Sequence, residues 1–259
     1  MATRTADEVE VNVRLFLGFF AGRTNPSSRL RRVGPIGAFL SFSLLLLPGV
    51  ALVLPGVATA QQVLSIAETE DLVRLRHYEG LPDEEAARIG ADGCARLIEM
   101  LGDPEEAGSH AEILLAIGAC GPEGGLEAIA AWADQPRDGE IDRATFRAWQ
   151  VLPFALAKLS EHDPRAVARL AARLENEDAP TWTFRHHRGD RLKKLRKRAA
   201  AEGLAETDLP EAEAVLGRAA ARAAEPAMRE HLERARERQR ERRGRRPEVR
   251  REVGWGATR

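Results

Sequence analysis

Aromatic and sulfur-containing side chains are scarce in this sequence of 259 residues. Aromatic residues make up 5% of it, and it contains only two cysteines, three methionines and one tyrosine. Aromatic and β-branched residues favour strands, whereas the alanine, leucine and charged residues that dominate here favour helices. We therefore predict an all-α protein, and the hydrophobic share of 44% is sufficient for a real core.

The spacings that bind metals or support catalysis are also missing. No two of the six histidines lie four residues apart, and there is neither a Cys-x-x-Cys pair nor a haem-attachment motif. The adjacent His186 and His187 are expected on the surface. We accordingly predict no catalytic residue, no metal site and no cofactor, so we do not expect an enzyme.

The two cysteines, Cys94 and Cys120, would be favoured to form a disulfide in an oxidising compartment. We expect a turn at residues 102–104 that joins two antiparallel helices. Cys94 then lies about 10 Å before this turn and Cys120 about 22 Å beyond it. Because a disulfide needs Cα atoms within about 7 Å, we expect two separate buried thiols.

The amino-terminal part of the chain is uncharged from Val33 to Ala67, and residues 36–57 within it are strongly apolar. This stretch is preceded by a basic flank of Arg29, Arg31 and Arg32. A basic flank followed by such a run is typical of a signal peptide or a membrane anchor. We assign residues 1–60 to a short amino-terminal extension followed by this signal peptide or membrane anchor.

A cleavage site is indicated at the end of the apolar run. Ala58 and Ala60 place small side chains three and one residues before Gln61, as signal peptidase requires. We predict cleavage before Gln61, and the alternative is an uncleaved anchor. In both cases the positive flank stays inside, so the rest of the chain is expected outside the cytoplasm, periplasmic or secreted, with membrane contact only through the amino-terminal segment.

Charge is distributed unevenly along the remainder. Residues 61–180 carry 24 acidic against 11 basic side chains, whereas residues 181–259 carry 13 against 22. Such a division favours either contact between the two halves or an anionic partner for the basic part.

A repeat of 41 residues organises the chain between Ser109 and Asp178. The apolar positions Leu115, Ala116, Leu126, Ile129 and Ala130 recur as Leu156, Ala157, Val167, Leu170 and Ala171. Repeated helical hairpins bury their apolar faces against their neighbours. With one further hairpin upstream, residues 61–178 are predicted to form an α-solenoid-like stack of about three antiparallel helical hairpins.

Turn residues set the expected helix limits in this stack. Helices are predicted over residues 62–79, from Asp83 as N-cap to Leu101, over residues 105–119 and over residues 122–133. On the first helix, Val63, Ile66, Val73 and His77 fall on one face by helical spacing. A polar turn at residues 135–140 then leads to the third hairpin.

The third hairpin resembles the HEAT-repeat family, including its short lyase-type variants. The resemblance rests on hairpin length, on Pro153 inside the first helix, and on Asp163 in the turn followed six residues later by Arg169. It implies a kink at Pro153 and a bond between neighbouring units through Asp163 and Arg169. The preceding unit departs from the pattern, with Glu112 where Pro153 would align.

Beyond the repeats the pattern loosens. We expect residues 179–188 to form a loop whose Trp182 and Phe184 cap the last hairpin. Residues 179–243 form a basic helical extension, with one helix over residues 212–243 that bends near Pro226 and protrudes or frays at its end. Residues 244–259 are predicted to be a disordered tail.

The best functional candidate in the sequence is a basic helix at the start of this extension. Its candidate anion-binding residues are Arg191, Lys193, Lys194, Arg196, Lys197 and Arg198. Six cations in eight residues suit phosphate or another polyanion, and the alternative is a solvated helix that neutralises the acidic repeats. Nucleic acid is not the expected target outside the cytoplasm.

Three functions follow from these patterns. The first is an exported, non-catalytic scaffold that presents its helical repeats to a protein partner. The second is binding of an envelope polyanion through residues 191–198. The third, less favoured, is an accessory subunit or a lyase-like enzyme.

Overall fold

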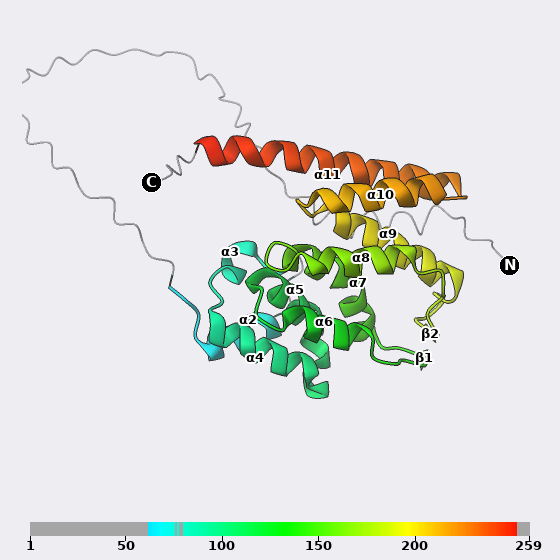
Figure 1. Ribbon diagram of the computed structural model, residues 1–259. Coiled ribbons are helices and arrows are strands. Elements are labelled where there is room, and N and C mark those ends of the chain that lie inside the picture. Colours follow the sequence, from blue (N-terminus) through cyan, green and yellow to red (C-terminus); the bar gives the residue numbers. More distant parts are fainter. Residues whose placement is uncertain (1–61, 76, 78–79, 253–259) are drawn as a thin grey trace, which may run out of the picture. The chain divides into compact units, whose positions relative to one another are not determined.

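The computed structural model describes residues 62–75, 77 and 80–252, and this part of the chain is mostly α-helical, with 71% in helices. About ten helices pack in pairs (Figure 1). They belong to one compact unit that begins at Gln62. The prediction of a mainly helical protein is confirmed.

The predicted cleavage site lies outside the described residues, because Ala58, Ala60 and Gln61 all precede residue 62. Among the described helices, none combines the length and apolar character that a membrane crossing needs.

The first described helix, α2 (Ile66–Arg74), is shorter than predicted. Ser65 caps it with a reciprocal capping box, in which the Ser65 hydroxyl accepts from the Glu68 amide and the Glu68 carboxylate accepts from the Ser65 amide. This cap fixes the helix start at Ile66 instead of Gln62. The predicted apolar face is therefore wrong in part: Val73 is buried, but Val63 is 63% exposed and Ile66 is also exposed.

The predicted second helix is in fact two helices, α3 (Asp83–Ala86) and α4 (Ala91–Gly102). Pro82 precedes α3 as its N-cap residue, so Asp83 is the first helical residue and not the cap. Gly90 provides the N-cap of α4.

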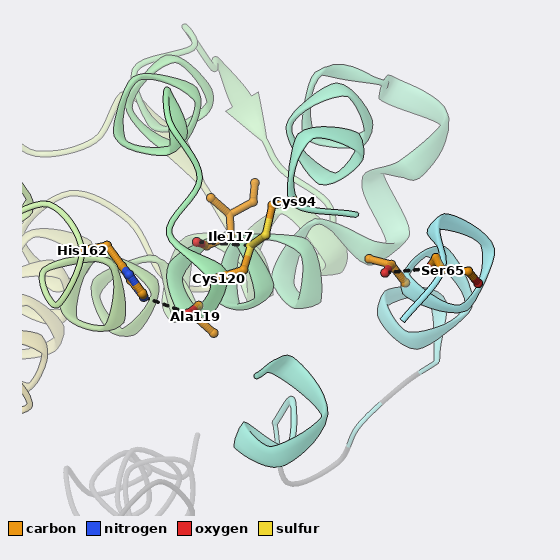
Figure 2. The surroundings of a disulfide bond; sticks show 7 residues. Ser65, Cys94, Ile117, Ala119, Cys120 and His162 are labelled. Atoms are coloured by element: carbon orange, nitrogen blue, oxygen red, sulfur yellow. Dashed lines mark hydrogen bonds between the residues drawn. A yellow bond between two sulfur atoms is a disulfide. The ribbon is translucent and has the colours of Figure 1, made fainter. Parts of the chain in front are cut away.

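A disulfide joins Cys94 to Cys120, which corrects the prediction of two separate thiols (Figure 2). A 3-10 helix, η1 (Pro104–Ser109), takes up the residues that we assigned to the start of the next helix, so α5 (His110–Cys120) begins five residues late. Cys94 and Cys120 then lie about 12 and 15 Å from the connection along antiparallel helices. Their Cα atoms are 6.3 Å apart, within the range of a disulfide.

The core is centred on α5 and on α7 (Arg143–Leu159), which pack against each other. The α5 side chains from His110 to Gly118 are all buried. Gly118 permits the close approach, since a Cβ at this position would stand 2.4 Å from the carbonyl oxygen of Ala155. The helix α6 (Gly125–Ala133) completes the hairpin with α5.

The third hairpin forms as predicted from α7 and α8 (Arg165–Glu175), with Pro153 inside α7. The ion pairs differ from those that the HEAT resemblance implies. Asp163 binds Arg165 within its own turn, with 2.7 Å between Oδ2 and Nη2. Arg169 instead pairs with Asp134 at the end of α6, at 3.1 Å, so the bond between hairpins uses a different carboxylate.

The polar turn and the aromatic loop are joined by a short parallel pair of strands. In this pair β1 (Gly139–Glu140) lies beside β2 (Trp182–Thr183). The Phe184 ring stacks on Phe146 of α7 at 4.1 Å between centroids, and Trp182 meets Trp149 edge to face at 5.0 Å. The prediction that this loop caps the last hairpin with its aromatic side chains is confirmed.

The carboxyl-terminal part contains α9 (Asp190–Ala205), α10 (Pro210–Arg222) and α11 (Pro226–Glu252). The chain reverses direction before Pro226, so the predicted single bent helix is two helices that lie side by side (Figure 1). The prediction that this region protrudes is wrong, because Leu232, Ala235 and Gln239 of α11 are buried. By helical spacing these residues form one narrow buried stripe on α11. In the sequence this stripe is hard to recognise because charged residues surround it.

The helix α11 also continues to Glu252, beyond Arg243 where we expected the ordered part to end. An ion pair between Arg245 and Glu241, four residues apart, supports this extension at 3.4 Å. Residues 253–259 of the predicted tail lie outside the described part.

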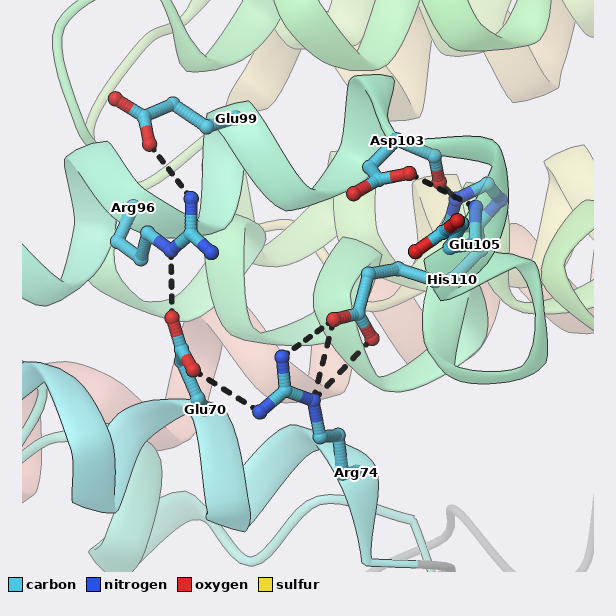
Figure 3. A network of polar contacts seen from close by, with 8 residues as sticks. Glu70, Arg74, Arg96, Glu99, Asp103, Glu105 and His110 are labelled. Carbon is cyan, nitrogen blue, oxygen red and sulfur yellow. Dashed lines mark hydrogen bonds and ion pairs between the residues drawn. The ribbon is translucent and has the colours of Figure 1, made fainter.

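Near the start of the unit, a network of ion pairs connects α2, α4 and η1 (Figure 3). Arg96 binds Glu70 at 2.6 Å and Glu99 at 2.8 Å, and Arg74 binds Glu70 at 2.9 Å and Glu106 at 2.5 Å. Each arginine here faces two carboxylates. We regard the network as structural.

Candidate functional site

The six predicted anion-binding residues all lie on α9, but they do not form one free cationic face. Lys193 and Lys197 both contact Glu177 of the acidic half. Lys194 pairs with Glu225 at 2.9 Å. These contacts correspond to the alternative that we left open, in which the helix neutralises acidic residues.

The other three predicted residues have different surroundings. Arg196 is buried, and its Nη2 donates to the carbonyl oxygens of Asn176 at 2.8 Å and Asp178 at 2.7 Å. The Nε of Arg198 is buried without a hydrogen bond within the described residues. Arg191 lies near His187, where its charge contributes to a lowered pKa of that imidazole, after burial as the main cause.

A cleft of about 400 Å³ lies between the end of α6, the helices α7, α8 and α9, and the loop that leads to β2. We call it the arginine cleft, because four arginines line it: Arg137, Arg169, Arg173 and Arg196. Its apolar lining includes Ile129, Leu152, Leu156, Trp149 and Trp182. The volume lies in the range typical of small-molecule sites.

Local structure fixes the two walls of the cleft that come from loops. The hydroxyl of Thr181 donates to the carbonyl oxygen of Arg137 at 2.8 Å, and the amide of Ile141 donates to the carbonyl oxygen of Thr183 at 2.9 Å. The turn after α6 and the loop before α9 are thereby held together. Side chains from segments about 45 residues apart in sequence consequently face one cavity.

Arg137 is held by main-chain carbonyl groups and by a ring. Its Nη2 donates to the carbonyl oxygen of Trp132 at 2.7 Å, and its Nη1 donates to that of Gln135 at 3.1 Å. The guanidinium also lies 4.5 Å from the centre of the Trp132 ring. Burial lowers the pKa of Arg137 below its usual range. The position of this charge is therefore fixed, but no carboxylate neutralises it within the described residues.

Trp132 in turn is positioned by a buried histidine. Its indole Nε1 donates to Nδ1 of His110 at 3.0 Å, so Nδ1 must be unprotonated. The His110 Nε2 is then the donor to the carbonyl oxygen of Asp103, at 3.2 Å. Burial lowers the pKa of His110, with a smaller contribution from the charge of Arg137. The neutral imidazole thus supports the wall that carries Arg137.

Arg173 is the least satisfied of the four arginines. Its Nε is buried and makes no hydrogen bond within the described residues. Its guanidinium lies 5.8 Å from the centre of the Trp149 ring. Burial, with a smaller contribution from the charges of Arg196 and Arg137, lowers the pKa of Arg173 to about 10. Because burial and like charges both oppose its positive form, this side chain is poised to accept an anion.

Asp134 is the only carboxylate among the residues that line the cleft. It binds Arg169 at 3.1 Å, and both side chains are about half exposed. Its charge also acts on Arg173, where it opposes the lowering of the pKa. The pair therefore forms a polar rim above the less exposed arginines and the apolar floor.

Of the four arginines of the cleft, sequence reasoning named Arg196 as a candidate anion-binding residue. It named Arg169 only for its place in the repeat. It did not identify Arg137 or Arg173. A weak signal was present for Arg173, which lies four residues after Arg169 on the same helix and next to the buried Leu174. Like charges at this spacing on one helix are unfavourable, so a pair of this kind is worth noting.

The described part of the chain contains no group of three or more His, Cys, Asp or Glu side chains placed to hold a metal ion. Comparisons of the chain with protein-family models, with curated proteins and with solved structures found no match.

Proposed function

We propose that this chain is a non-catalytic binding protein that recognises an anionic group in the arginine cleft. The proposal is carried by Arg173, a half-buried cation whose Nε is fully enclosed and which has no hydrogen-bonded or ion-paired partner in the described structure. Charged groups inside proteins are normally paired, and an unpaired one near a cavity is a candidate binding residue. The other arginines of the cleft add attraction for the same anion.

The geometry of the cleft suits the binding of an anion by arginine side chains, and no chemical reaction is required. A guanidinium offers donors in a planar fork that match a carboxylate or phosphate. The apolar floor, with Leu152, Leu156 and Trp149, reduces competition from water and strengthens the interaction. This site takes the place of the exposed basic helix as the anion-binding region, with Arg196 common to both.

Two broader expectations belong to the same proposal. One is export, which the amino-terminal sequence favours and with which the disulfide between Cys94 and Cys120 agrees, since such bonds persist in oxidising compartments. The other is a HEAT-like stacking of the hairpins, for which the support is the paired packing of the helices around α5 and α7. A partner that carries the anionic group would dock beside α8.

Binding of phenyl phosphate by the full chain, measured by isothermal titration calorimetry, tests the proposal. Arg173→Met should weaken binding by about tenfold or more, since hydrogen bonds to charged groups are worth roughly 1.5–3 kcal/mol. The control is Arg165→Met on the same helix, which removes an exposed arginine that pairs with Asp163 and Glu127. Equal binding by wild type and Arg173→Met would contradict the proposal.

A further inference from the structure

The charge balance of the arginine cleft indicates what kind of anion it can hold. This step rests on the proposed function. Four arginines and one aspartate line the cleft, which leaves an excess of three positive charges among the lining residues. A ligand with one negative charge would leave two of them unbalanced. A ligand with two charges close together fits this surplus better.

The arginines of the cleft differ in what they can offer to such a ligand. Arg137 and Arg196 already use Nη atoms on main-chain carbonyl oxygens, so they are fixed in place and act mainly through their charge. Arg173 makes no hydrogen bond to any residue that the structure describes, so its donors remain available to a ligand. A compact anion can accept hydrogen bonds from Arg173 and is also attracted by the fixed charges of Arg137 and Arg196.

Asp134 has the position of a competitor. Its carboxylate pairs with Arg169 at the rim, and it is the one negative charge in the lining that acts favourably on Arg173. An anion that enters the cleft must approach this carboxylate, and like charges at close range repel each other. Asp134 therefore weakens the binding of every anion, while the surplus of arginine charge in the lining still favours a ligand with two charges over a ligand with one.

We infer that the arginine cleft selects a compact dianion, such as a phosphate monoester or a dicarboxylate, and that Asp134 competes with this ligand for the arginines. Both ligand types place two negative charges within a few ångströms of each other. The Trp149 and Leu152 side chains then face the uncharged body of the ligand.

The test compares matched ligands on the full wild-type chain by calorimetry at pH 7.5. Phenyl phosphate has two charges at this pH, because the second pKa of a phosphate monoester is about 6. Benzenesulfonate keeps the ring and the tetrahedral oxygens but has one charge. We expect phenyl phosphate to bind about tenfold more tightly or better. Phthalate against benzoate makes the same comparison for carboxylates and distinguishes the two ligand types.

Two results separate this inference from the proposed function. Equal affinity for the singly and doubly charged ligands would overturn the inference that the cleft selects a dianion, but the proposal that it binds an anion would stand. Absence of binding for all four ligands would overturn the proposed function as well.

Asp134 is tested by Asp134→Asn, which should tighten the binding of phenyl phosphate by about threefold, as expected for a partly exposed charge. The binding of benzenesulfonate should tighten by less, because the repulsion grows with the charge of the ligand. Asp138→Asn removes a nearby exposed carboxylate that does not line the cleft and should leave both affinities unchanged. Weaker binding by Asp134→Asn would show that this carboxylate organises the arginines and does not compete with the ligand.

Discussion

The arginines of α11 and those of the cleft have opposite surroundings. On α11, Arg240 binds Glu213 of α10 at 2.6 Å, Arg238 binds Glu202 of α9 at 2.5 Å, and Arg242 approaches Glu206 at 2.8 Å. In the cleft, Arg173 has no such partner within the described residues. The same residue type thus serves two purposes in one compact unit.

This difference shows why net charge is a poor guide to function here. The carboxyl-terminal part is strongly basic in sequence, yet most of its described cations pair with a carboxylate, among them Lys197, Arg240 and Arg242. An unpaired cation, Arg173, also lies in the acidic half, on α8, where the total composition would not place it. What matters is the pairing of each cation and not the number of cations.

The largest expected effect tests whether α11 is a packed helix and not a charged tail. Leu232 is 2% exposed, in the stripe that faces α9 and α10. Leu232→Ala should lower the free energy of unfolding by about 2–4 kcal/mol through lost burial and the cavity left behind. Urea denaturation measures the change, and Glu230→Ala on the exposed side is the control. A change as small as that of the control would indicate that α11 contributes only charge.

A smaller effect, dependent on pH, tests the support of the cleft by His110. The pKa of His110 is lowered in the folded protein, so folding favours the neutral ring. Its contribution to stability is complete above the unfolded value of about 6.5 and is lost as the pH falls through the lowered folded value. Protonation of Nδ1 also ends its acceptance of the Trp132 hydrogen bond.

His110→Gln should remove this part of the decline in stability between pH 7 and 5, as measured by thermal unfolding at several pH values. The exposed His186→Gln serves as its control. An identical decline in stability in wild type and His110→Gln would contradict the proposal that His110 supports the wall that carries Arg137.

Local patterns in the sequence were sufficient for the elements that depend on near neighbours. The hairpin of α7 and α8 follows from apolar spacing and from the turn at Asp163. The aromatic cap was predictable because Trp182 and Phe184 are rare apolar side chains in a polar segment. In both cases the signal lies within a few residues of the feature that it predicts.

Other features depend on contacts that spacing does not encode. The disulfide was missed because a 3-10 turn at Pro104–Ser109 shortened α5 and brought Cys120 level with Cys94. Pro226 suggested a bend, but a proline at the first position of a helix equally suits a new helix after a reversal. The cleft was missed because Arg137 and Arg173 are brought to one cavity only by long-range contacts, the ion pair of Asp134 with Arg169 and the loop at Thr181.

The central claim is that Arg173 is retained for binding at the expense of stability. The most direct test measures the free energy of unfolding of wild type and Arg173→Met, each with and without saturating phenyl phosphate, with Arg240→Met as a paired-arginine control. Without ligand, Arg173→Met should be more stable than wild type by about 1 kcal/mol, because an unpaired, half-buried charge is removed. A ligand at 100 times its Kd should stabilise wild type by about 2.7 kcal/mol and reverse the order. Arg240→Met should be less stable than wild type and keep the response to ligand. An Arg173→Met variant that is less stable than wild type without ligand, and equally stabilised by it, would contradict the account.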